Sequence, residues 1–318
     1  MAIASIDSTI LPDTNGRSWY HESVVGSRQL LITAGDSWTW GDSLGQTTLE
    51  FDDYKYRTQH IYGTHLAELL GSDFVNIGLP GRSNLNIIEH VDLVLSNLTH
   101  QYDNIQVVFT LTEVGREITD VIGLINNRSH YQDVWQGPDW PTYDQLINNT
   151  ASAEQLAIVK SETQATLFGH SINLFLELQQ ATTLDELFCI IERYTFEELQ
   201  KCCSNVKYII ARNFTDTFNS NYNNQLVKDK WTDVIAQQGP LTPYPSPVRC
   251  LTQMSIAPMV QLVEHLNLDL KAQWITVLES AEHAVNWLDA SPYNSKRASK
   301  HPLEQAHRWW AEYLYKQI

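Results

Sequence analysis

The sequence is poor in basic residues. Of its 318 residues only 21 are lysine or arginine, against 37 aspartate and glutamate, which gives a formal net charge of −16. A surplus of this sign repels phosphate backbones and anionic lipid headgroups, so it argues against nucleic acids and membrane surfaces as partners. It also disfavours strongly anionic substrates, unless Arg82 or Arg116 creates a local positive site.

Cysteine is also scarce, and long apolar runs are missing. The four cysteines are Cys189, Cys202, Cys203 and Cys250. They form neither a disulfide framework nor a zinc pattern, so we expect reduced side chains, no metal site and no cofactor. The sequence has no run of about 18 apolar residues, so we expect no transmembrane helix. The first residues lack the basic segment and apolar run of a secretory signal, so we expect a protein made in the cytoplasm.

Hydrophobic residues make up 43% of the chain, which is enough for a sizeable core. Short apolar runs predict buried strands at 30–34, 74–78, 105–111 and 206–214. Helical spacing of apolar residues predicts helices at 58–70, 84–98, 268–288 and 302–315. Because strands and helices alternate with short connections, we expect an α/β domain with a parallel sheet and helices on both faces.

The domain organisation follows from the same pattern. Residues 1–28 are polar and irregular and read as an N-terminal arm, while residues 29–318 form one α/β domain. Many more residues separate the third and fourth strands than one crossover helix needs, which predicts a helical insertion at about 117–204. Within it, the aromatic stretch 131–143 (YQDVWQGPDWPTY) is expected to be an exposed loop where a lid would lie.

Candidate functional residues follow the strands, because ligands of open parallel sheets bind at the carboxyl ends of the strands. Gly35-Asp36-Ser37 follows the first strand, and a second copy of this tripeptide at 41–43 lies in a loop. Gly78 to Asn84 follows the second strand, Thr112 to Arg116 the third, and His301 precedes the last helix. A serine, glycine-bearing turns and a histidine can supply a nucleophile, oxyanion donors and a general base.

Three segments resemble sequence blocks of the GDSL/SGNH hydrolase family, in the order in which the family has them. LLITAGDSWTWGDSL resembles the first block, NIGLPGRSN the second and HPLEQAHRWWAEYL the fifth. The resemblance implies a three-layer α/β/α sandwich with a flavodoxin-like parallel sheet, and hydrolysis of acyl esters of lipids or carbohydrates. Sequences of this kind are similar to those found in bacteriophage genomes.

The resemblance also implies roles for individual residues. It makes Ser37 the nucleophile and His301 the base. Gly81 and Thr112 would form the oxyanion hole, with Asp36 in support. The candidate substrate contacts are Asn84, Arg82 and Arg116.

Two positions depart from the family pattern. Thr112 stands where the family has an oxyanion-binding asparagine, and Ala298 stands where it has the acid that orients the histidine. Losing one oxyanion donor typically costs about 10²–10³ in rate, and losing the acid of a related triad costs about 10⁴.

Three functional hypotheses therefore stay open. The first is a serine esterase or deacylase acting on a small or carbohydrate-linked acyl ester. The second is a catalytically degenerate structural or adhesive protein of the same fold, such as a bacteriophage virion component with protein partners in a larger assembly. The third, a carbohydrate-binding module, rests only on the 10 tryptophans and 14 tyrosines.

Overall fold

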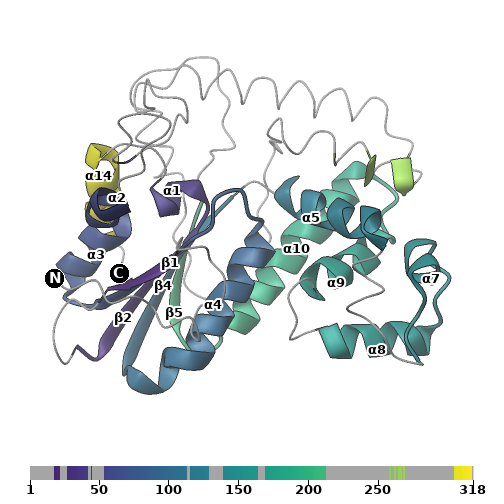
Figure 1. Cartoon of the computed structure of the whole chain (residues 1–318), viewed down its shortest axis with the longest axis horizontal. Coiled ribbons are helices and arrows are strands. Elements are labelled where there is room, and N and C mark those ends of the chain that lie inside the picture. Colours follow the sequence, from purple (N-terminus) through teal and green to yellow (C-terminus); the bar gives the residue numbers. More distant parts are fainter. Residues whose placement is uncertain are drawn as a thin grey trace, which may run out of the picture.

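The chain forms a five-stranded sheet with strand order β1-β3-β2-β4-β5. Helices lie on both sides of this sheet (Figure 1). The computed structural model describes residues 18–21, 27–41, 44, 54–112, 115–128, 139–163, 169–212, 258, 261–262, 264–266, 268, 304–316 and 318. Its strands are β1 (Ser18–His21), β2 (Gln29–Gly35), β3 (Asp73–Gly78), β4 (Asn104–Leu111) and β5 (Lys207–Arg212). Strands β3, β2, β4 and β5 run parallel, which confirms the predicted α/β class with a parallel sheet.

The register of the parallel strands brings three strand ends together. Gly35, the last residue of β2, pairs with Gly78 at the end of β3 on one side and with Thr110 near the end of β4 on the other. The carboxyl ends of these strands therefore lie at one edge of the sheet, and the segments that follow them start side by side.

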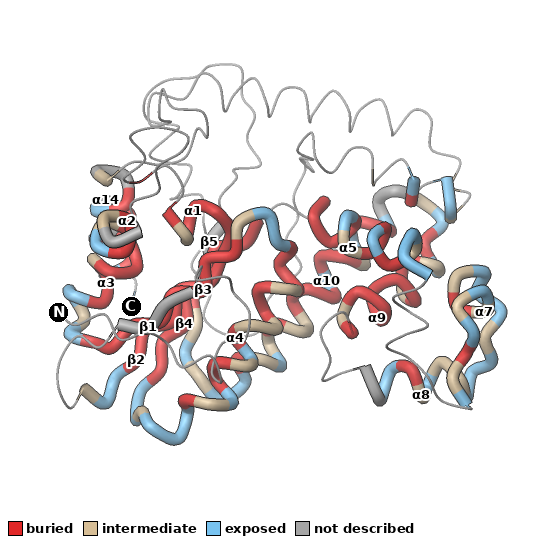
Figure 2. The backbone as a smooth tube through the Cα atoms, in the orientation of Figure 1, coloured by how far each residue is buried: buried red, intermediate tan, exposed pale blue. Residues whose placement is uncertain are grey.

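Side chains alternate between the two faces of the sheet, because successive residues of a strand point in opposite directions. In β2, Leu30, Ile32 and Ala34 belong to one buried core cluster and Leu31 to a second. The first cluster includes side chains of helices α4 (Asn84–Leu98), α5 (Gly115–Asn126), α9 (Gly169–Leu178) and α10 (Leu184–Cys202). The second includes side chains of α1 (Ser37–Trp40), α3 (Tyr62–Leu70) and α14 (Glu304–Tyr315). Figure 2 shows the sheet buried between these helices.

Most of the described residues between β4 and β5 are helical. This segment holds α5, α7 (Tyr143–Ile147), α8 (Ala153–Thr163), α9 and α10. Buried residues of these helices, among them Leu146, Val159, Phe175 and Phe188, belong to the same core cluster as the strands. This helical segment therefore shares the hydrophobic core of the sheet.

Two expectations about local structure were wrong. Residues 18–21 of the arm are not irregular but form β1, which pairs antiparallel with the edge strand β3, so the sheet is not wholly parallel. The single helix expected at 58–70 is two helices, α2 (Tyr54–His60) and α3, separated at Ile61, whose backbone is extended (φ −74°, ψ 155°). Both differences arise from contacts with distant parts of the chain, which local sequence patterns do not reveal.

Other expectations fall on residues that the structure does not describe. These are residues 1–17 and 22–26 of the arm, residues 269–288 of the predicted helix, residues 131–138 of the aromatic loop, and residues Ala298 and His301. The remaining predicted strands and helices are confirmed. Gly71, which follows α3, has the left-handed conformation (φ 63°) that commonly ends a helix.

Candidate functional site

Ser37 lies at the carboxyl end of the central strand β2. Gly35 ends the strand, Asp36 adopts an extended conformation, and Ser37 is the first residue of α1. The Asp36 carboxylate caps this short helix by accepting a hydrogen bond from the main-chain N–H of Trp38 at 3.0 Å. A Cβ at position 35 would overlap Thr39 Oγ1, so only glycine lets α1 fold back so closely on the strand end. Ser37 is 8% exposed.

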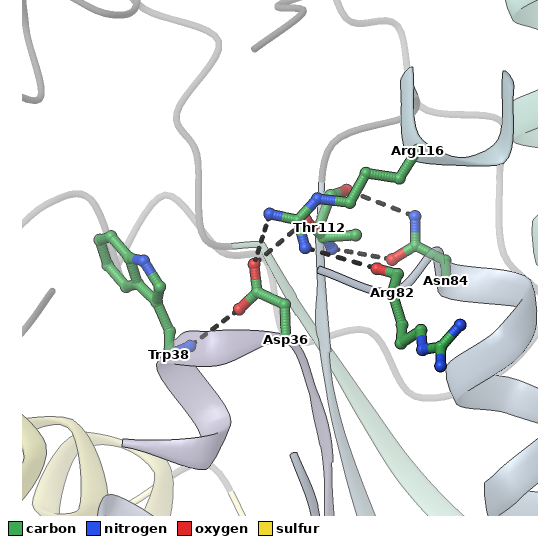
Figure 3. Close-up of polar contacts among 6 residues, drawn as sticks. All are labelled: Asp36, Trp38, Arg82, Asn84, Thr112 and Arg116. Atoms are coloured by element: carbon green, nitrogen blue, oxygen red, sulfur yellow. Dashed lines mark hydrogen bonds and ion pairs between the residues drawn. The ribbon is translucent and has the colours of Figure 1, made fainter. Parts of the chain in front are cut away.

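A tight turn follows β3. The main-chain N–H of Arg82 donates to the carbonyl of Leu79 at 3.1 Å, with Pro80 and Gly81 between them. Gly81 has a φ of +75°, which fits the third position of a type II turn and favours glycine there. Gly81 and Arg82 are exposed. Figure 3 shows the guanidinium of Arg82 directed away from Asp36.

Asn84 joins this turn to the segment after β4. Its side-chain Oδ1 accepts the main-chain N–H of Thr112 at 2.8 Å, and its Nδ2 donates to the carbonyl of Thr112 at 3.3 Å. The side-chain amide thus pairs with the backbone of Thr112 as a neighbouring strand would. Asn84 is the first residue of α4 and is buried.

Asp36, which follows β2, contacts two residues that follow β4, and these two residues in turn contact Arg82 and Asn84 after β3 (Figure 3). Its Oδ2 accepts a hydrogen bond from Thr112 Oγ1 at 3.1 Å and lies 3.4 Å from Nη2 of Arg116. Arg116, near the start of α5, also donates from Nη1 to the carbonyl of Arg82 at 3.4 Å. The Asp36 side chain is 1% exposed and that of Arg116 10%, so this is a buried ion pair.

Helix α5 contributes two further carboxyl groups to the start of α4. Glu117 Oε1 accepts the main-chain N–H of Asn84 at 2.7 Å, and Asp120 Oδ2 accepts from Ser83 Oγ at 2.5 Å. Burial, together with the nearby charge of Asp120, raises the pKa of Glu117 to about 8. Burial likewise raises the pKa of Asp120 above its usual range. Neither residue stands out in the sequence, because acidic residues early in a helix are ordinary and only the fold shows that Glu117 is buried and Asp120 partly buried.

The structure therefore brings together most of the predicted site residues. Asp36, Ser37, Asn84, Thr112 and Arg116 lie at the same edge of the sheet, with Gly81 and Arg82 in the adjoining turn. The hydroxyl of Thr112 has a single proton, and in this arrangement it is donated to Asp36. His301 is outside the described residues, and the catalytic and binding roles of all these residues stay predictions.

In comparisons with known proteins, no family model, no curated protein and no solved structure matches the chain. Among the described residues, no three histidine, cysteine, aspartate or glutamate side chains gather in a way that could hold a metal ion. In the same part of the chain, no helix has both the length and the apolar character needed to cross a membrane.

Proposed function

We propose that the chain is a serine esterase or deacylase of the GDSL/SGNH type, with Ser37 as the nucleophile. The order of the parallel strands supports the fold that this proposal requires, which is a flavodoxin-like parallel sheet. Numbered along the chain, the four parallel strands follow the order 2-1-3-4, which is that of flavodoxin-like sheets. Core clusters on both faces fit a three-layer α/β/α sandwich.

One observation carries the proposal. Ser37 is placed at the carboxyl end of β2 between the segments that follow β3 and β4, where ligands of such sheets bind. Polar contacts converge on the residue before it, since Asp36 is bonded to Trp38, Thr112 and Arg116. The backbone next to Ser37 is therefore fixed at the strand end, which supports a nucleophilic role because reaction rates depend on the position of the attacking atom.

The proposed reaction is acyl transfer in two steps. Ser37 Oγ forms a bond to the acyl carbon of the ester while its proton passes to His301, and the ester C–O bond breaks as His301 returns that proton to the leaving alcohol. Water then hydrolyses the acyl–serine ester by the same route in reverse. Main-chain N–H groups of Ser37 and Gly81 would bind the oxyanion, and Thr112 could assist only by releasing Asp36.

Two observations favour particular features of this reaction. Helix α14, which follows His301 in the sequence, contributes Trp310 to the same core cluster as Trp38 of α1. Helix α14, which begins shortly after His301 in the sequence, therefore packs in the same core as α1, which begins with Ser37. The charge of Arg116 is matched by Asp36, which favours neutral substrates such as acylated sugars or small esters.

Hydrolysis of p-nitrophenyl acetate tests the proposal. We expect Ser37→Ala to lower kcat/KM by at least about 10³-fold, because the covalent step is lost. Ser43→Ala is a matched control, since Ser43 ends the second Gly-Asp-Ser tripeptide, and it should retain the rate of the unmodified protein. Equal rates for the unmodified protein and Ser37→Ala would refute the proposal.

A second candidate function is a structural or adhesive protein with a degenerate site, such as a virion component. The observation that favours it is the hydrogen bond from Thr112 Oγ1 to Asp36, which occupies the group standing in for the family's asparagine. This candidate predicts no ester hydrolysis above the buffer rate and stable co-purification with a larger assembly. Turnover by a monomer in solution would refute it.

A further inference from the structure

The start of α4 is held to α5 by two acidic side chains one turn apart. Glu117 accepts the main-chain N–H of Asn84, the first residue of α4, and Asp120 accepts the hydroxyl of Ser83, the residue that caps this helix. Carboxyl groups stabilise a helix N-terminus because the first N–H groups have no partner within the helix. This arrangement fixes where the turn after β3 lies relative to α5.

Glu117 is the more deeply buried of the two carboxyl groups, with 1% of the residue exposed. Its Oε2 is buried and has no hydrogen-bond partner among the residues that the structure describes. A charged carboxylate in such a place loses its hydration, and the few hydrogen bonds it gains do not offset that loss, so burial raises its pKa. A protonated carboxyl group tolerates the same place much better, because it carries no charge.

We propose that Glu117 is a positioning residue of the Ser37 site, which ties the turn after β3 to α5 and so keeps Asn84 and Thr112 beside Asp36. This inference rests on the proposed function. Glu117 does not touch Ser37 itself. It acts through the main chain of Asn84, whose side-chain amide is hydrogen-bonded to both the main-chain N–H and the carbonyl of Thr112. The hydroxyl of Thr112 then bonds Asp36, the residue before the nucleophile.

The protonation state of Glu117 decides whether this chain of contacts holds. With its pKa raised to about 8, chiefly by burial, the carboxyl group is mostly neutral at pH 7. Above pH 8 it would carry a charge in a buried place next to Asp120, and it lowers its free energy by moving to water. That movement breaks the hydrogen bond with Asn84 and releases the turn.

The other ionisable groups near this junction have partners of their own. Asp120 is bonded to Ser83, and Arg116 is paired with Asp36. On α9, His170 faces Glu198 and Glu177 faces Arg193. Among the described residues of the turn after β3 and of α4, the other charged or titratable groups are Arg82, Glu89, His90 and Asp92, of which Glu89 and His90 are hydrogen-bonded to Asn86. Of the charged neighbours, it is Asp120 that acts on Glu117, by repulsion.

Two substitutions separate a positioning role from simple packing. Glu117→Gln keeps an acceptor for the Asn84 N–H and cannot ionise, whereas Glu117→Leu fills the space without an acceptor. We expect Glu117→Gln to keep the kcat of the unmodified protein at pH 7 and to lose the fall in kcat above about pH 8. Glu117→Leu should lower kcat by up to about 10²-fold with a smaller change in KM, because the site is displaced while binding is kept. Glu154→Gln, at an exposed carboxyl of α8, should change neither value.

A second measurement does not depend on turnover. The backbone amide resonance of Asn84, followed by NMR from about pH 6 to about pH 10, should titrate with the pKa of Glu117 in the unmodified protein and stay constant in Glu117→Gln. An Asn84 resonance that is constant in both proteins would overturn the inference.

The kinetic outcomes separate this inference from the function on which it rests. Hydrolysis that survives Ser37→Ala refutes the proposed function, whatever Glu117 does. Hydrolysis that requires Ser37, but has the same kcat and pH profile in Glu117→Gln and Glu117→Leu as in the unmodified protein, refutes only the role of Glu117.

Discussion

The main-chain N–H of Tyr62 donates a hydrogen bond to Nδ1 of His307, 3.1 Å away, across 245 residues of sequence. Tyr62 is the first residue of α3, and Ile61 before it has no side-chain group that could cap the helix. His307 is fully buried and its ring stacks on that of Tyr62. The imidazole of α14 thus caps α3, which requires Nδ1 to be unprotonated.

Replacing His307 should therefore destabilise the protein more than an ordinary helix substitution does. We expect His307→Ala to lower the free energy of unfolding by about 2–4 kcal/mol, because it removes the cap and leaves a cavity. His307→Asn retains a side-chain acceptor near the position of Nδ1 and should lose less. Urea unfolding measures both values, with His100→Ala as the control because His100 is exposed. Equal stability of His307→Ala and the control would contradict the capping role.

The ion pair between Asp36 and Arg116 gives a second prediction. Arg116→Met keeps most of the side-chain volume but leaves a buried carboxylate without its counter-charge, so we expect a loss of about 3 kcal/mol in unfolding free energy. Arg116→Lys should lose less, because it keeps the charge but not the planar group.

Removing both charges isolates the interaction. The double variant Asp36→Asn with Arg116→Met should be more stable than Arg116→Met alone, since no unpaired charge is then buried. Unfolding of the four proteins in one double-mutant cycle gives the coupling free energy. Additive losses would show that the two side chains do not interact.

The pH dependence of stability should also change when Glu117 is replaced. The pKa of Glu117 rises from 4.5 to about 8 on folding, so between these values the native state holds a proton that the unfolded state has released. Stability therefore falls as the pH rises through this window, by a few kcal/mol at most. Glu117→Gln has no such proton, so its stability relative to the unmodified protein should rise from about pH 5 to about pH 8 and then level off. A constant difference across this range would be the contrary result.

Replacing glycine by alanine should change the stability of the protein in opposite directions at two positions. Gly123 lies within α5 with open space where a Cβ would be, so Gly123→Ala should stabilise the protein by about 0.5–1 kcal/mol. At Gly35 a Cβ would meet Thr39 and the carbonyl oxygen of Thr110, so Gly35→Ala should destabilise by about 1–3 kcal/mol. Thermal unfolding of both variants checks the signs, and a stabilising Gly35→Ala would show that α1 can move away from the strand.

Local patterns in the sequence were enough to predict the four parallel strands and the helix α4 that follows β3. The apolar run at 30–34 became β2, and the apolar spacing after Ser83 became α4, with the helix running over 84–98 as predicted. The predicted site residues Asp36, Ser37 and Thr112 also came to one edge, because parallel strands in neighbouring positions end on the same side. These features depend on residues close together in the sequence and on general rules for sheets.

What the sequence determined by itself is therefore the positions of the four parallel strands along the chain and the edge where the candidate site lies. Only the tertiary structure decided that residues 18–21 join the sheet, that the helix breaks at Ile61, and that Glu117 is a buried acid at the start of α4. Each of these depends on a hydrogen bond or on burial contributed by a distant segment. A residue's neighbours in the sequence carry no information about such partners, because folding alone brings them together.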